Sequence, residues 1–135
     1  MAWVVDSCVL LDIRMSDSEF GLASAKCLAG HLSDGLTIAP ITYVELAPAF
    51  RGDPGIQNAF LEQAGVEWLT SWTRAETEIA HQLWAAHIEK KRAGQTSKRP
   101  VADVFIEAFA RRFQGIITRN AKHFTTVPVI TPARG

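Results

Sequence analysis

Residues 3–12 read WVVDSCVLLD, and the predicted fold is built outward from this stretch. Its first three residues continue an apolar run that ends at Asp6, so residues 1–6 are interpreted as a buried strand. Unbroken apolar runs are typical of strands in a parallel sheet that is covered on both faces. In open sheets of this kind, ligands bind at the carboxyl ends of the strands. Asp6 is therefore expected at the edge of the sheet where a functional site would lie.

The rest of the chain alternates between predicted strands and predicted helices. Short apolar strands are expected at residues 36–39, 66–70 and 115–118, and a final edge strand at 127–130. Helices are expected after a capping box at residues 16–19, over residues 41–50 and 56–65, after a second capping box at 73–76, and over 101–113. Pro48 should kink or shorten the helix at 41–50, and the polar stretch 89–100 is expected to be a loop. This order predicts an α/β fold with a parallel sheet, in a single domain over residues 1–135.

The composition is that of an ordinary globular protein, with 47% hydrophobic and 21% charged residues among 135. No apolar run is long enough to cross a bilayer, and the first residues lack the pattern of a signal peptide, so a cytoplasmic location is expected. The two cysteines are too few for a disulfide framework and lack metal-ligand spacing.

The charge is unevenly distributed although the net charge is zero. Residues 1–87 contain four Lys and Arg and eleven Asp and Glu, whereas residues 88–123 contain nine Lys and Arg and three Asp and Glu. Such asymmetry can mark a surface that meets a polyanion, and it can equally be a solvated run of charges. A basic face beside an acidic pocket would suit phosphodiester chemistry.

Three acids stand beside apolar residues that should bury them or hold them in a cleft: Asp6, Glu45 in YVELA and Asp103 in VADVF. A buried carboxylate must be paired, hydrogen-bonded or bound to a metal, and a hard cation such as Mg²⁺ or Mn²⁺ would offset the repulsion among three of them. Each acid also has a simpler interpretation. Asp6 could cap the helix that follows, Glu45 could be exposed on an amphipathic helix, and Asp103 could share a salt-bridged stripe with Glu107 and Arg111.

Four segments in this order carry a resemblance to a known family: WVVDSCVLLD at the start, TYVELA after the second strand, PVADVFIEAFA before the fourth, and GIITRNAKHF near the end. Together they span nearly the whole chain. The sequence resembles the PIN-domain family and, within it, the VapC-type toxin ribonucleases of type II toxin–antitoxin pairs. The resemblance implies a PIN-like three-layer sandwich whose central parallel sheet has the strand order 3-2-1-4-5, with helices on both faces.

The resemblance also implies a site. Asp6, Glu45 and Asp103 match the three principal acids of the family, and Asn120 stands at a fourth position that is commonly Asp. These four residues are the expected catalytic and metal-binding residues, with Ser7 and Thr118 in support. Because Asn120 carries no charge, one strongly bound Mg²⁺ or Mn²⁺ ion is expected rather than two. Pro48, soon after Glu45, is a departure from the family's pattern.

The implied function is a metal-dependent endoribonuclease that cleaves structured RNA by a metal-activated water, with a cognate antitoxin as partner and a homodimer as the assembly. Candidate phosphate contacts are Lys98, Arg99, Arg119 and Lys122. The main alternative is a catalytically weak PIN-fold module that binds nucleic acid or protein, which Asn120 favours. An aspartyl phosphatase is less favoured, because it would need a second Asp where Cys8 stands.

Overall fold

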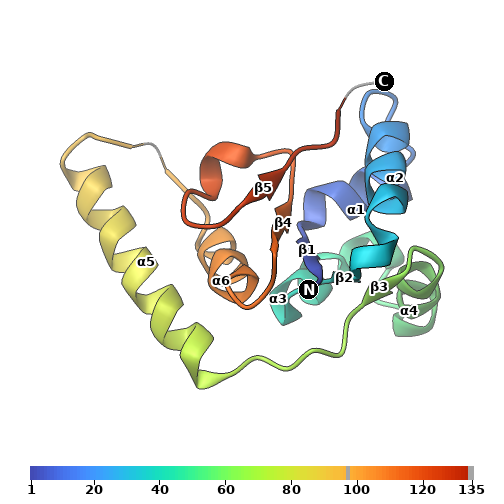
Figure 1. The fold of residues 1–135 in the computed structure, drawn as a ribbon, viewed down its shortest axis with the longest axis horizontal. Coiled ribbons are helices and arrows are strands. Elements are labelled where there is room, and N and C mark those ends of the chain that lie inside the picture. The colour runs from blue at the N-terminus through green and yellow to red at the C-terminus, as the bar shows by residue number, and fades with distance from the viewer. Residues whose placement is uncertain (97, 134–135) are drawn as a thin grey trace.

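The computed structural model describes residues 1–96 and 98–133, in which short strands alternate with helices (Figure 1). The strands are β1 (Trp3–Val5), β2 (Leu36–Thr37), β3 (Val66–Glu67), β4 (Gly115–Ile117) and β5 (Val129–Ile130). The α-helices are α1 (Ser7–Arg14), α2 (Gly21–Gly30), α3 (Pro40–Glu45), α4 (Pro54–Gln63), α5 (Arg74–Arg92) and α6 (Val101–Ala110). Short 3₁₀ helices are η1 (Leu32–Asp34), η2 (Ala47–Phe50) and η3 (Ala121–His123).

The strands form one sheet in the order β3-β2-β1-β4-β5, and every neighbouring pair is parallel. This confirms the predicted α/β class and strand order. The chain runs outward from β1 through β2 to β3, then returns to place β4 on the other side of β1. The order therefore reverses between β1 and β4, and such a switch point is where open α/β sheets bind ligands.

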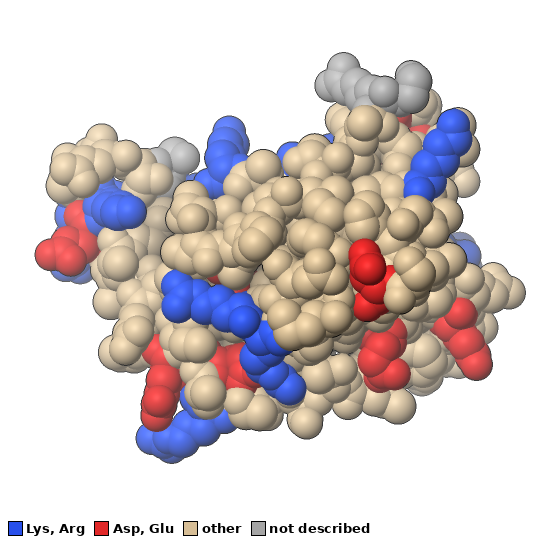
Figure 2. Space-filling model, viewed as in Figure 1, with Lys and Arg blue, Asp and Glu red and all other residues tan. Residues whose placement is uncertain are grey.

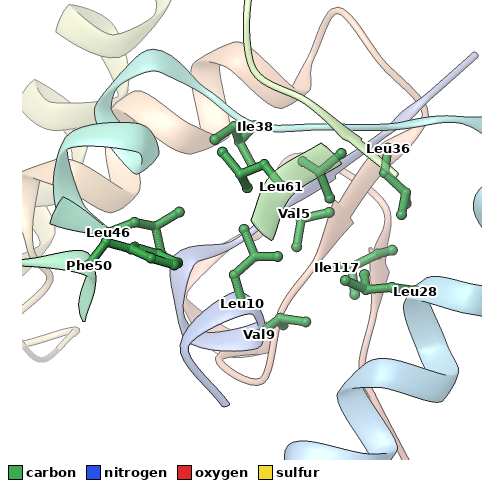
Figure 3. Close-up of a cluster of buried hydrophobic side chains, with 11 residues drawn as sticks. Val5, Val9, Leu10, Leu28, Leu36, Ile38, Leu46, Phe50, Leu61 and Ile117 are labelled. Atoms are coloured by element: carbon green, nitrogen blue, oxygen red, sulfur yellow. The ribbon is translucent and has the colours of Figure 1, made fainter. Parts of the chain in front are cut away.

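Helices cover both faces of the sheet. Successive strand residues point to opposite faces, so neighbouring residues of one strand pack against different helices. Val4 and Ile116 pack with α6 on one face, and α5 lies on the outer side of α6 (Figure 1). Val5 and Ile117 point to the other face, where they meet side chains from α1, α2, η2 and α4 (Figure 3). The buried residues of this second cluster include Val9, Leu10, Leu28, Phe50 and Leu61. Full burial of each such side chain contributes about 1.5–3 kcal/mol.

The start of the second helix differs from the prediction. Ser16 has a positive φ of 51°, which a helix does not permit, so the capping box expected at residues 16–19 does not form. Asp17 instead accepts hydrogen bonds from the backbone nitrogens of Glu19 and Phe20, at 3.1 and 2.8 Å. The helix then begins at Gly21. The preceding helix α1 was indicated only through the alternative that Asp6 caps a helix, and no bounds were predicted for it.

Other local features follow the sequence more closely. Thr73 and Glu76 form the expected capping box, and the buried Glu76 is paired with Arg112 at 2.6 Å. Helix α3 ends at Glu45 and Pro48 lies in η2, so the predicted shortening of this helix is confirmed. The predicted loop over residues 89–100 is wrong at its start, because α5 continues to Arg92. Basic side chains in the last turn of a helix complement its dipole, and this favours the extension.

None of the helices within residues 1–96 and 98–133 combines the length and the apolar character needed to cross a membrane.

Candidate active site

Asp6 lies at the switch point of the sheet, one residue beyond β1, and only 3% of it is exposed. Its Oδ1 accepts a 2.8 Å hydrogen bond from the backbone nitrogen of Ser7, so Asp6 does cap α1 as the simpler interpretation expects. Its Oδ2 accepts a 2.6 Å hydrogen bond from the hydroxyl of Thr118, which follows β4. Asp6 can therefore cap α1 and also be a carboxylate of a functional site, because the capping side chain is held at the sheet edge.

Thr118 joins two strands of the site through one buried hydroxyl. Its Oγ1 accepts a 3.0 Å hydrogen bond from the backbone nitrogen of Asn120, so the hydroxyl proton is left to be donated to Asp6. This chain of bonds fixes the rotamer of Asp6. Thr118 thus orients the carboxylate of Asp6, and the supporting role predicted for it stays a prediction.

The carboxylates of Asp6, Glu45 and Asp103 influence one another electrostatically. Burial raises the pKa of Asp6 above its ordinary value, and repulsion from Asp103 raises it further, while the hydrogen bond from Thr118 acts in the opposite direction. Partial burial also raises the pKa of Glu45, as does repulsion from both Asp6 and Asp103, against a hydrogen bond from Ser7 that lowers it. Like charges shift one another's pKa in this way when they share a site. Asp6 after β1 and Glu45 of α3 thus both lie close enough to Asp103 of α6 to feel its charge.

Asp103 lies in the first turn of α6 and its side chain is 14% exposed. Nδ1 of His123, which ends η3, stands 2.6 Å from its Oδ2. An ionised carboxylate can only accept, so this contact is a hydrogen bond from His123 to Asp103 in the tautomer that carries the proton on Nδ1. Nothing in the sequence indicated His123 as part of the site. Twenty residues separate the partners, and no local spacing signals the contact.

Asn120 is exposed, and its backbone nitrogen contacts Thr118. It precedes η3 without a side-chain capping bond. Its predicted role in metal binding stays a prediction, as does that of Ser7 in orienting the site.

The donor set is chemically suited to a hard divalent cation, because carboxylate oxygens are the ligands that Mg²⁺ and Mn²⁺ prefer. A cation among the three acids would relieve the repulsion that raises the pKa values of Asp6 and Glu45. Within residues 1–96 and 98–133, however, no three His, Cys, Asp or Glu side chains are gathered closely enough to form a preassembled metal-binding group. The three carboxylates are thus ligands of the right chemical type for such an ion. They would have to move closer together to bind it.

Two of the four predicted phosphate contacts form internal ion pairs. Arg119 binds Asp12 through two hydrogen bonds, of 2.6 and 3.0 Å, and stacks over Phe20. Arg99 binds the buried carboxylate of Glu107 at 2.6 Å. Lys98 and Lys122 are exposed, and both line a pocket that His123 also lines. The two lysines are therefore the solvent-exposed members of the predicted set.

Cys8 lies beside the acids without being available as a nucleophile. Its Sγ is 3.5 Å from Oδ2 of Asp6, and burial together with that carboxylate raises the pKa of the thiol to about 11. At neutral pH the thiol is protonated, whereas the thiolate is the reactive form. Cys8 is therefore not the reactive group at this edge of the sheet.

No protein-family model matches the chain, and no match was found among curated proteins.

Proposed function

We propose that this protein is a Mg²⁺- or Mn²⁺-dependent endoribonuclease of the PIN type. The observation that carries the proposal is the placement of Asp6 at the switch point of a 3-2-1-4-5 parallel sheet, with Glu45 of α3 and Asp103 of α6 near enough to raise pKa values at the site. Mutually repelling carboxylates at a ligand-binding edge are unfavourable for stability, and such perturbed groups cluster at functional sites. The resemblance of four sequence segments to the PIN-domain family supports the same activity.

In the proposed reaction, Asp6 and Asp103 hold the cation and Glu45 orients or deprotonates the attacking water. When bound, the ion supplies a water of lowered pKa and positive charge opposite the scissile phosphate. The raised pKa of Glu45 makes this carboxylate a better proton acceptor than an ordinary surface glutamate. In-line attack would leave a 5′-phosphate and a 3′-hydroxyl.

Thr118 and His123 serve as positioning residues in this scheme. Each donates a 2.6 Å hydrogen bond to a different acid, so Asp6 and Asp103 keep one fixed orientation while the ion binds. Partners of this kind behind metal ligands are worth about 10- to 100-fold in metal affinity or activity. Asn120 would complete the set through its amide oxygen.

Asp6→Asn tests the assignment, because it keeps the size of the side chain and removes its charge. Cleavage of a structured RNA in Mn²⁺ should be abolished while the circular dichroism spectrum stays that of the wild type. Asp34→Asn is the matched control, since Asp34 is exposed in η1, which precedes β2 rather than following a strand. Full activity of the Asp6→Asn protein would refute the role proposed for this residue.

The wider role belongs to the same proposal and is supported by the sequence resemblance alone. The protein would be the toxin of a toxin–antitoxin module in the cytoplasm, a homodimer, and the target of an antitoxin that inserts a segment with a basic side chain into the acidic site. Co-purification with the product of a neighbouring reading frame, together with loss of cleavage in that complex, would test it.

A second candidate function is a PIN-like module that binds nucleic acid or protein with little catalysis. Two observations favour it: Asn120 replaces an acid, and no three potential ligands among the described residues are preassembled around a metal position. Titration with Mn²⁺ discriminates the two, because a binding module without a metal site would show no saturable heat or thermal shift.

A further inference from the structure

A pocket of about 280 Å³ lies beside the candidate active site, between the carboxyl half of α5 and η3. His87 and Lys90 of α5 line one side, Lys98 and Arg99 lie between α5 and α6, and Lys122 lies on η3. Figure 2 shows basic side chains at the carboxyl end of α5, which forms one wall. The pocket is thus enclosed by segments that are far apart in the sequence.

Cationic side chains dominate the described lining. It contains Lys90, Lys98, Arg99 and Lys122, and Glu107 is the one carboxylate among the described lining residues. Glu107 is fully buried, and its oxygens already accept hydrogen bonds from Arg99 at 2.6 Å and from the backbone nitrogen and hydroxyl of Thr126 at 2.8 and 2.7 Å.

This carboxylate therefore balances Arg99, whereas the three lysines form no ion pair with any of the described residues. All three are exposed, so their ammonium groups can reach a ligand.

Two further groups in the lining point to an anion. The Nε of Arg99 is buried and, within the described part of the chain, has no hydrogen-bond partner. Burial lowers the pKa of His87, and the positive charges of Arg99, Lys91 and Lys90 lower it further. Because its pKa is lowered, His87 reports the positive charge of its neighbours and adds little of its own. A bound anion would stabilise the cations around His87 by supplying counter-charge.

His123 connects this pocket to the acids. It lines the pocket, and its Nδ1 contacts Oδ2 of Asp103. One imidazole ring thus separates a carboxylate of the candidate active site from the basic cavity. A polyanion that reaches Asp103 would have its neighbouring groups at the mouth of the pocket.

We propose that this pocket binds a phosphate group of a nucleic-acid strand and so fixes the strand next to the candidate active site. The inference rests on the proposed nuclease function for the identity of the strand. Lysines contact phosphate as point charges, and such contacts position a nucleic acid without reading its sequence.

The first test uses inorganic phosphate and the four histidines of the chain as reporters. The wild-type protein is titrated with phosphate in EDTA at constant pH and ionic strength, and the imidazole signals are followed by NMR. His87 and His123 should shift saturably, because they line the pocket, whereas His31 and His81 should not. Equal shifts of all four signals, or none at His87 and His123, would overturn the proposal.

Matched lysine variants test the charge. Lys90→Ala should weaken phosphate binding about tenfold, the usual effect of removing a hydrogen bond to a charged group. Lys26→Ala is the control, because Lys26 is exposed on α2 and does not line the pocket. Equal losses in the two variants would show a diffuse field of charge rather than a site.

A fluorescent single-stranded RNA then distinguishes the source of the phosphate. Anisotropy in EDTA is measured with a 5′-hydroxyl and a 5′-phosphate form of the same strand. Equal affinities assign the pocket to an internal phosphodiester, and tighter binding of the 5′-phosphate form assigns it to a strand end. Binding unaffected by Lys90→Ala in both forms would overturn the nucleic-acid assignment.

None of these measurements needs a metal or cleavage, so the two proposals can fail separately. Selective shifts of His87 and His123 without any nuclease activity would keep the pocket and reject the proposed function. Metal-dependent cleavage with uniform histidine shifts would keep the proposed nuclease function and reject the phosphate pocket.

Discussion

The imidazole of His123 stands 2.6 Å from the carboxylate of Asp103 and holds it from outside the sheet. Asp103 lies at the start of α6, and His123 ends η3 after the chain has passed through β4. The contact fixes the side chain of a candidate metal ligand to a separate element. Because the same ring lines the basic pocket, it also sets the boundary between the acidic and basic parts of the surface.

We expect His123→Ala to reduce metal-dependent RNA cleavage about 10- to 100-fold, since Asp103 loses the partner that orients it. His123→Asn should restore much of the activity, because the Asn amide nitrogen occupies nearly the place of Nδ1 and can donate the same bond. The measurement is kcat together with the Mn²⁺ concentration at half-maximal rate. If the Asn and Ala variants lose the same activity, the hydrogen bond to Asp103 does not explain the effect of His123 on cleavage.

Thr118→Val removes a buried donor to Asp6 and keeps the shape of the side chain. The unsatisfied carboxylate oxygen should cost about 1–3 kcal/mol of the free energy of unfolding, measured with urea. Thr118→Ser retains the hydroxyl and should lie close to the wild type in stability. A Val variant as stable as the Ser variant would show that Asp6 does not depend on this hydrogen bond.

The pH dependence of stability should reveal the raised pKa of Asp6. The unfolded chain ionises Asp6 near its ordinary pKa of 3.8, whereas the folded protein does so at higher pH. Its destabilising effect is therefore absent below that value and grows as the pH rises toward the folded pKa. In EDTA, the wild type should lose stability relative to Asp6→Asn between these two pKa values. A stability difference that stays constant with pH, or that changes in favour of the wild type, would contradict the assigned shift.

A divalent cation should stabilise the folded protein by relieving the same repulsion. At a Mn²⁺ concentration about 100 times its Kd, the gain would be about 2.7 kcal/mol, or roughly 10 °C in the melting temperature. Asp103→Asn should lose most of this shift, and Asp34→Asn should keep it. An unchanged melting temperature of the wild type in Mn²⁺ would favour the binding-module alternative.

The sequence predicted the framework of the fold because apolar runs identify buried strands, and alternation with helices predicts a parallel sheet. The strand order came from the resemblance, and the structure confirms it. Helix α1 escaped prediction because the apolar run continues past Asp6, and the first capping box was wrong because Ser16 adopts a left-handed conformation. Local patterns do not show where one apolar element stops and the next begins.

Within the candidate site, the three acids could be named from the sequence because each stands beside an apolar stretch. Their partners could not. His123 lies 20 residues from Asp103, so only the folded chain reveals this pair. Beside the three acids, Arg119 and Asp12 form a further pair whose members are 107 residues apart. The same holds for Arg99, which reads as a free loop cation in the sequence and is bound to Glu107 in the structure.

The most direct test of the central claim is cleavage of a mixed pool of structured RNAs by the purified protein in Mg²⁺, Mn²⁺ or EDTA, beside Asp103→Asn. We predict discrete cuts that leave 5′-phosphate ends, depend on the metal, and are absent from the Asp103→Asn reaction. Identical RNA patterns for the wild type and Asp103→Asn over a broad range of protein and metal concentrations would contradict the nuclease assignment.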